Sequence, residues 1–172
     1  PELPQQTRSS RSGLVLLQRV GVMDPTSLEA YRAAGGYTAL ARAFVMGAET
    51  VIREVAESTL VGRGGAAFPT ARKWEAVRAQ PALPHYLVCN ADESEPGTFK
   101  DRVLLTEDPF AIVEAMTIAA FASRCEQGFV YVRAEYPLAW ERLSGAVSQA
   151  RASGLLGDNI LGHGIRFDIE IR

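Results

Sequence analysis

Two unusual loops follow one another between Thr59 and Arg102, and they constrain this chain more than any other feature. The first, residues 61–70 with the sequence VGRGGAAFPT, is here called the glycine loop. The second, residues 89–102 with the sequence CNADESEPGTFKDR, is called the acidic loop. Glycines let a backbone approach a ligand closely and turn several N–H groups toward it, whereas carboxylates accept hydrogen bonds from hydroxyls or bind a cation. The pair predicts a ligand that has both phosphates and hydroxyls.

The small residues of the glycine loop match a dinucleotide-binding fingerprint in spacing, but their context differs. Gly62, Gly64 and Ala67 fit the pattern G-x-G-x-x-A. That fingerprint requires a strand before the loop, whereas residues 48–58 are predicted to form a helix. We therefore reject the ordinary Rossmann fingerprint and keep its physical content, which is a backbone that can come close to an anion.

A helix is predicted to begin where the glycine loop ends, which makes this loop a candidate anion site. Thr70 is the expected N-cap of a helix that continues to residue 79, and a helix N-terminus beside glycines binds anions. Arg63 adds a planar charged donor. Lys73 stands in the first helical turn, where a cation opposes the helix dipole unless an anion lies nearby. The plainer alternative is a tight turn with an exposed arginine.

The acidic loop follows a short apolar run at 85–89 that predicts a buried strand. Ligands of open α/β sheets bind beyond the carboxyl ends of strands, so Asp92, Glu93 and Glu95 are well placed for a site. A solvated acidic turn is the plainer alternative. Another is a phosphoryl-transfer domain in which these carboxylates hold Mg²⁺. The glycine loop lacks the Gly-Lys-Ser/Thr ending of a P-loop, which counts against that domain.

The rest of the sequence alternates predicted helices with short apolar runs, which predicts a layered α/β domain with a mostly parallel sheet and a small helical N-terminal region. Helices are predicted over 27–34, 38–46, 48–58 and 70–79, as a short and then a buried helix within 103–123, and from Pro137, where Trp140, Leu143 and Val147 form a stripe typical of a core or interface. Strands are predicted over 85–89, 128–132 and 165–171, with a further short strand or extended arm over 13–20. The expected division is an N-terminal extension and helix at 1–37 and the α/β domain at 38–172.

Composition and charge exclude several classes of partner. Of the 172 residues, 47% are hydrophobic and 22% are charged, which is typical of a globular protein. With 18 basic and 20 acidic residues the formal charge is −2, so we expect no general affinity for nucleic acid or for an anionic membrane. The longest apolar run, at 110–122, is too short to span a bilayer, and we expect no direct membrane contact. Cys89 and Cys125 fit no metal-site spacing, and a reducing, cytoplasmic location is expected.

Several motifs together resemble one family closely. With Lys73-Trp74, the glycine loop and the acidic loop resemble the NADH-binding flavoprotein subunit of respiratory complex I, the 51-kDa type, and its relatives in NAD-linked hydrogenases and formate dehydrogenases. The segments YVRAEYP at 131–137 and NILG at 159–162 also look like family segments. The resemblance covers roughly residues 38 to 172 and matches only the first part of such a subunit. Family members usually have Gly where this chain has Ala67.

This resemblance implies an atypical Rossmann-like α/β fold with FMN and NAD(H) as cofactors. It implies that a hydride passes from NADH to the flavin and that electrons leave through iron–sulfur clusters, with no protein residue as general acid or base and no metal site in this chain. The FMN contacts that it implies are Gly62, Arg63, Gly64, Gly65, Lys73, Asn90, Asp92, Glu93 and Ser94. The NAD contacts that it implies are Gly64, Gly65, Ala66, Ala67, Phe68, Thr70 and Glu95.

The resemblance also implies parts and partners beyond these residues. Family members continue with a Gly-Glu-Glu segment and a Cys-rich helical domain that holds a 4Fe-4S cluster. They work with other subunits, among them a thioredoxin-like 2Fe-2S subunit, in the peripheral arm of a membrane complex or in a soluble enzyme. The chain begins without Met and its last residues read like a strand, so we expect a fragment. Because the Gly-Glu-Glu segment completes the flavin site in the family, we expect these residues alone to bind FMN weakly or not at all. The alternative is a non-catalytic scaffold fragment or paralogue.

Overall fold

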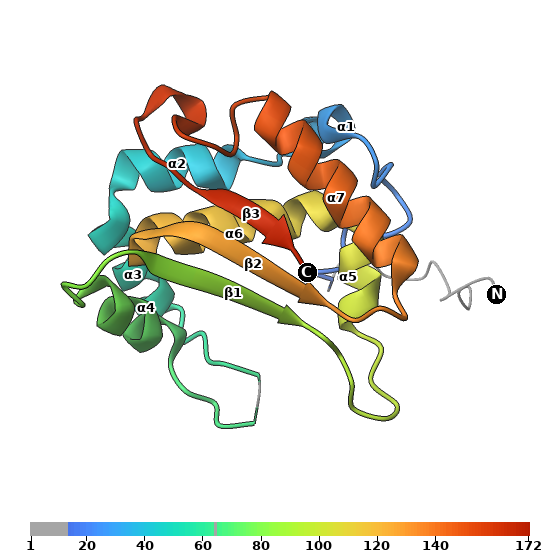
Figure 1. Cartoon of the computed structure of the whole chain (residues 1–172), viewed down its shortest axis with the longest axis horizontal. Helices are drawn as coiled ribbons and strands as arrows, with labels where there is room; N and C mark the ends of the chain where they lie inside the picture. Colours follow the sequence, from blue (N-terminus) through green and yellow to red (C-terminus); the bar gives the residue numbers. More distant parts are fainter. Residues whose placement is uncertain (1–13, 64) are drawn as a thin grey trace.

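Helices and parallel strands alternate along the chain in the computed structural model, which describes residues 14–63 and 65–172 (Figure 1). The helices before the sheet are α1 (Leu28–Ala33), α2 (Thr38–Met46), α3 (Ala48–Glu57) and α4 (Thr70–Arg78). The elements that follow are β1 (His85–Ala91), α5 (Asp101–Glu107), α6 (Pro109–Ser123), β2 (Cys125–Val132), α7 (Pro137–Ala152), the short 3₁₀ helix η2 (Ile160–Gly162) and β3 (Asp168–Ile171). This order confirms the predicted α/β class.

The sheet has the strand order β1-β2-β3, and both pairs of neighbours are parallel. Val88 of β1 lies beside Phe129 of β2, which lies beside Glu170 of β3. Parallel neighbours need crossover connections, here α5 and α6 after β1 and α7 after β2. Figure 1 shows α6 behind the sheet, where it contacts β1 and β2, and α7 running alongside β3, which it contacts. The carboxyl ends of all three strands therefore lie at the same end of the sheet, and there β1 leads into the acidic loop.

The opposite face of the sheet carries exposed apolar side chains. Tyr86, Val88 and Tyr131 are 57%, 63% and 54% exposed. Parallel sheets are usually covered on both faces and their strands are usually apolar throughout. Here burial alternates along β1 and β2, so these strands are half-buried rather than fully buried as predicted.

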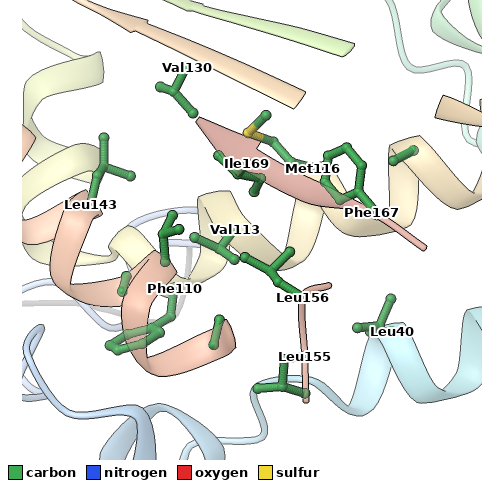
Figure 2. Packing of buried hydrophobic residues seen from close by; sticks show 14 of the residues in the cluster. Leu40, Phe110, Val113, Met116, Val130, Leu143, Leu155, Leu156, Phe167 and Ile169 are labelled. Carbon is green, nitrogen blue, oxygen red and sulfur yellow. The ribbon is translucent and has the colours of Figure 1, made fainter. Parts of the chain in front are cut away.

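Helix α6 lies at the centre of the hydrophobic core because apolar residues surround it on nearly every side. Phe110 and Val113 are fully buried, and Figure 2 shows them with Met116 among side chains from α7, β2 and β3. A Cβ at position 128 would lie 2.6 Å from the ring of Phe167, so only Gly128 allows this close approach. The absence of a side chain at Gly128 therefore lets Phe167 and Met116 of α6 pack closely against β2.

A buried carboxylate joins the N-terminal helices to α6. Glu114 accepts hydrogen bonds from the hydroxyl of Tyr31 at 2.6 Å and from the backbone N–H groups of Tyr37 at 2.8 Å and Leu40 at 3.0 Å. Tyr37, the N-cap of α2, is in the left-handed region with φ of 64° and makes no side-chain cap bond. The carboxylate of Glu114 thus supplies the cap that the local sequence of α2 lacks.

The N-terminal region contains both a confirmed and a wrong prediction. Helix α1 begins after Ser27, whose hydroxyl accepts the N–H of Ala30 at 3.1 Å, as expected of a cap. Residues 14–20 form turns rather than a strand or extended arm, and residues 1–13 lie outside the described part of the chain. The division at residue 37 stays a prediction, although α1 shares its core with α6.

One further local prediction is wrong, and the prediction that an apolar stripe on the helix from Pro137 belongs to the core or an interface holds for the core only in part. Thr70 is the first residue of α4 and Pro69 is its N-cap, because the start of this helix is set by a backbone bridge rather than by a side chain. Trp140, predicted to belong to an apolar stripe, is 54% exposed, whereas Leu143 and Val147 of that stripe are buried. The buried face of this helix therefore includes Leu143 and Val147 but not Trp140.

Candidate functional site

An antiparallel bridge between Val61 and Pro69 closes the glycine loop at its base. The N–H of Gly62 donates to the carbonyl oxygen of Phe68 at 2.9 Å. Pro69 is also the N-cap of α4, so the loop leads directly into that helix. Gly64 lies outside the described residues. The described part is thus a loop closed by a bridge at the N-terminus of a helix, an arrangement that favours anion binding.

The ammonium group of Lys73 lies against the glycine loop. It is 3.4 Å from the point that a Cβ would occupy at Gly62 and 5.8 Å from the centre of the Phe68 ring. Gly65 has φ of 101°, and a Cβ there would meet nothing within 4 Å. Arg63 is exposed beside it. The structure therefore brings a cation, an aromatic ring and glycine backbone together beside open space.

Replacing Ala67 with glycine is expected to stabilise the glycine loop. Ala67 has φ of 49°, which is left-handed and costs an alanine about 1 kcal/mol more than a glycine. Glycine has more conformational freedom than alanine in the unfolded chain, and this offsets part of the gain. We therefore expect the free energy of unfolding, measured in urea, to rise by about 0.5 kcal/mol. The neighbouring Ala66, which is outside the left-handed region, serves as control. Equal gains from Ala66→Gly and Ala67→Gly would contradict this explanation.

The acidic loop begins at the carboxyl end of β1. The side-chain oxygen of Asn90 accepts the N–H of Asp92 at 3.2 Å, and the hydroxyl of Ser94 donates to the carboxylate of Asp92. Asn90, Ser94 and Glu95 are exposed, and Asp92 is half-buried. Burial raises the pKa of the Cys89 thiol just before them. Near its start the loop therefore exposes hydrogen-bonding groups and a carboxylate, and the half-buried thiol of Cys89 precedes them in β1.

Glu93 is oriented differently from its neighbours and is only 6% exposed. Its carboxylate accepts the backbone N–H groups of Asp101 and Arg102 at the start of α5, and the hydroxyl of Tyr136 at 3.0 Å. The guanidinium of Arg133 donates to the carbonyl oxygen of Glu93 at 3.0 Å. Burial raises the pKa of Glu93, but these bonds to its carboxylate outweigh burial and hold the pKa below its ordinary value of 4.5.

This lowered pKa predicts how stability depends on pH. A carboxylate with a lower pKa in the folded state stabilises the fold above its unfolded pKa and loses that effect as pH falls through the folded pKa. We expect the wild-type chain to be more stable than a Glu93→Gln variant at neutral pH, and this difference to shrink as pH falls below 4.5. Urea unfolding of both proteins over this range measures the difference. A difference that does not change with pH would contradict the prediction.

Sequence reasoning gave no role to three of the residues around Glu93. Arg102 ends the acidic loop, and Arg133 and Tyr136 belong to the segment YVRAEYP. The only sequence signal for these three residues is that they belong to motifs shared with the family that the sequence resembles. The spacing of residues in a sequence does not predict that residue 93 will contact residues that follow the next strand. The parallel crossover from β1 to β2 is what places them together.

Both loops extend outward beyond β1, on the side away from β2 (Figure 1). The acidic loop follows the carboxyl end of β1, and the glycine loop lies nearer to α4. No hydrogen bond or ion pair between the described residues joins them. The carboxylate of Glu93 is hydrogen-bonded to N–H groups at the start of α5, so it does not form a Mg²⁺ site with Asp92 and Glu95. Within the described residues there is no group of three potential metal ligands. A surface hollow beside Phe121 and Arg124 lies at the opposite end of the strands.

A parallel sheet with a glycine loop on a helix N-terminus and polar groups at the carboxyl end of a strand defines a nucleotide-binding α/β protein of the Rossmann-like type. The family model of the Nuo51 FMN-binding domain, from the 51K protein of complex I, matches residues 55–172. This chain belongs to that family. The matched residues include both loops, so the predicted family is confirmed.

Individual relatives agree with this family. A subunit of the NADH-quinone oxidoreductase of Aquifex aeolicus is 45% identical over 157 residues, which are 91% of this chain and 36% of that protein. The HndC protein of the NADP-reducing hydrogenase of Solidesulfovibrio fructosivorans is 46% identical over 92% of this chain and 32% of its own length. The crystal structure of an air-oxidized NAD⁺-reducing [NiFe]-hydrogenase superimposes with a TM-score of 0.65 at 31% identity, over 92% of this chain and 24% of that chain.

The chain therefore spans about a third of the length of the curated relatives that it matches. Those relatives are, by name, subunits of NADH-quinone oxidoreductase and of a hydrogenase. Among the helices of the described residues, none is long and apolar enough to cross a membrane.

Proposed function

We propose that this chain provides the FMN-holding part of a flavoprotein subunit that oxidises NADH. Family membership supports the proposal, and one structural feature carries it, namely the Lys73 ammonium beside the Gly62 backbone at the start of α4. A cation, a helix N-terminus and glycine N–H groups together suit the phosphate of FMN. When bound, FMN would supply the redox chemistry, accepting a hydride from NADH and passing single electrons toward iron–sulfur clusters.

The two loops divide the binding of FMN and NADH in this proposal. Donors in the glycine loop bind phosphate, the exposed groups after β1 bind hydroxyls and the flavin ring, and an aromatic side chain contacts a base. The FMN contacts are Gly62, Arg63, Gly64, Gly65, Lys73, Asn90, Asp92, Glu93 and Ser94. The NADH contacts are Gly64, Gly65, Ala66, Ala67, Phe68, Thr70 and Glu95. The open space beside Gly65 and the exposure of Ser94 and Glu95 agree with ligand access.

The complete activity extends beyond these residues in the proposal. We assign a 4Fe-4S cluster to a Cys-rich helical domain of the longer subunit, and a thioredoxin-like 2Fe-2S subunit as the next electron carrier. The named relatives include subunits of both an NADH-quinone oxidoreductase and a hydrogenase, so the proposal covers either kind of multi-subunit enzyme. Its location is the cytoplasm, including the peripheral arm of a membrane complex.

Anaerobic reduction by NADH tests this function. The product of the complete gene is loaded with FMN and mixed with NADH while the long-wavelength flavin absorbance is followed. We expect rapid bleaching that depends on NADH concentration, because the proposal places both ligands in one site. Tight FMN binding without any bleaching would contradict an NADH-oxidising role and favour a non-catalytic scaffold.

A further inference from the structure

We propose that Tyr136 and Arg133 are positioning residues that hold the acidic loop in its ligand-binding conformation through Glu93. With Arg102 they form a group that we call the Glu93 cluster. This inference rests on the proposed function and revises one of its contacts, because it assigns the buried side chain of Glu93 to the support of the site rather than to contact with FMN. The groups that face FMN and NADH would then be the neighbours of Glu93 along the loop.

The backbone of Glu93 is the first observation. Its φ is 47°, in the left-handed region that residues other than glycine rarely adopt. Such a conformation costs free energy and persists only where surrounding contacts hold it. The bond from Arg133 to the Glu93 carbonyl, at 3.0 Å, is made from the segment that follows β2. The acidic loop is thus held, at its non-glycine residue with a positive φ, by a side chain from the segment that follows β2.

The carboxylate of Glu93 is the second observation. Its side chain is fully buried, and it binds two N–H groups at the N-terminus of α5 as well as the hydroxyl of Tyr136. Arg102 donates to the Tyr136 hydroxyl at 2.7 Å and to the carbonyl of Thr98 at 3.3 Å. These bonds join both Glu93 and the last residue of the acidic loop, Arg102, to one tyrosine, and they leave the Glu93 carboxylate turned away from solvent.

The ring of Tyr136 is the third observation. The guanidinium carbon of Arg102 lies 4.7 Å from its centre and that of Arg133 lies 5.4 Å from it. Arg133 is held in turn by two bonds to Glu135, at 2.9 and 3.2 Å. Stacking of this kind adds to the hydrogen bonds and restricts both arginines. Tyr136 therefore connects the start of α7 to the loop that follows β1.

The position of Glu93 determines which polar groups of the acidic loop are free to bind a ligand. With Glu93 held inward, Ser94 and Glu95 are exposed and Asn90 is exposed just before them. Release of Glu93 would free the backbone on both sides of it, so the exposed groups would lose their fixed spacing. Preorganised groups bind a ligand more tightly than mobile ones because less ordering is needed on binding. FMN affinity should therefore depend on residues that do not contact FMN.

A double-mutant cycle in the product of the complete gene tests this role. Tyr136→Phe keeps the ring and removes one hydrogen bond to a carboxylate, so we expect FMN affinity, measured by quenching of flavin fluorescence, to fall about fivefold. Glu93→Gln should weaken FMN binding about tenfold, and the double variant should be no weaker than Glu93→Gln alone, because both changes release the same contact. Tyr86→Phe, an exposed tyrosine at the other end of β1, should have no effect.

Amide hydrogen exchange of the Asp101 and Arg102 N–H groups supplies a readout that does not need FMN. Both variants should speed this exchange. The thermal unfolding midpoint should change little in Tyr136→Phe, whereas Glu93→Gln should also lower stability at neutral pH, as predicted above. Additive losses of FMN affinity would overturn the inference by showing that Glu93 contacts FMN independently of Tyr136. Unchanged exchange or unchanged affinity in Tyr136→Phe would overturn it as well. If the wild-type protein binds no FMN, the proposed function fails, and the exchange data still decide whether Tyr136 holds the loop.

Discussion

A Glu114→Gln substitution is expected to destabilise the chain by about 3 kcal/mol, which lowers the midpoint of thermal unfolding by about 10 °C in a domain of this size. The buried carboxylate of Glu114 accepts one hydroxyl and the backbone N–H groups of Tyr37 and Leu40. Glutamine has nearly the same shape, but its amide nitrogen donates and would face a donor. At least one buried N–H would lose its partner, and α2 would lose its cap. Urea and thermal unfolding measure the effect.

Glu57→Gln is the matched control for this substitution. Glu57 is exposed at the last residue of α3, and surface changes of this kind usually alter stability by less than about 0.5 kcal/mol. Equal stabilities of Glu114→Gln and Glu57→Gln would show that the carboxylate does not cap α2 in solution. A Tyr31→Phe variant should fall between them, since it removes one of the three donors.

A Lys73→Met substitution is expected to weaken FMN binding by about 10- to 100-fold, which corresponds to the loss of about 1.5–3 kcal/mol from one hydrogen bond to a charged group. Methionine keeps most of the apolar stem of the side chain but removes the ammonium group, which lies beside Gly62 and 5.8 Å from the centre of the Phe68 ring. The fold should not change, because Lys73 is exposed. Fluorescence titration of the complete gene product with FMN measures the loss.

Arg72→Met provides the control for Lys73→Met. Arg72 lies in the same turn of α4, carries the same charge and is exposed. Its removal changes the net charge and the helix-terminal field in the same way, so any general electrostatic effect would appear in both variants. An equal loss of FMN affinity in both variants would contradict a specific role for Lys73.

Much of the fold could be predicted from the sequence because strong local signals coincide with it. Glycine at 47 and proline at 109 and 137 mark helix boundaries that the structure confirms. The strand or extended arm expected over 13–20 forms turns in its described residues, 14–20, since a short apolar run without periodicity favours no element strongly. Sequence also placed Glu114 in a buried helix, but its partners come from residues that lie 74 to 83 positions earlier in the chain. Only tertiary packing brings them together.

The sequence predicted which loops form the candidate site, but not how their side chains are oriented. Both loops were located from their glycines and carboxylates, and the position of the acidic loop after β1 is confirmed. Nothing in the run Asp92-Glu93-Ser94-Glu95 distinguishes the one carboxylate that turns inward, because that choice is made by Tyr136 and Arg133 across a crossover. Assignment of individual residues to FMN and NADH stays a prediction.

The central claim is that both loops hold one FMN, and a fluorescence titration of the complete gene product with FMN tests it most directly. Wild-type protein is compared with Arg63→Ala in the glycine loop and Asn90→Ala in the acidic loop, both exposed residues whose replacement should leave the fold intact. We expect saturable quenching with one FMN per chain in the wild type, and clearly weaker binding in each variant. Absence of quenching in the wild type, or full affinity after a change in either loop, would contradict this claim.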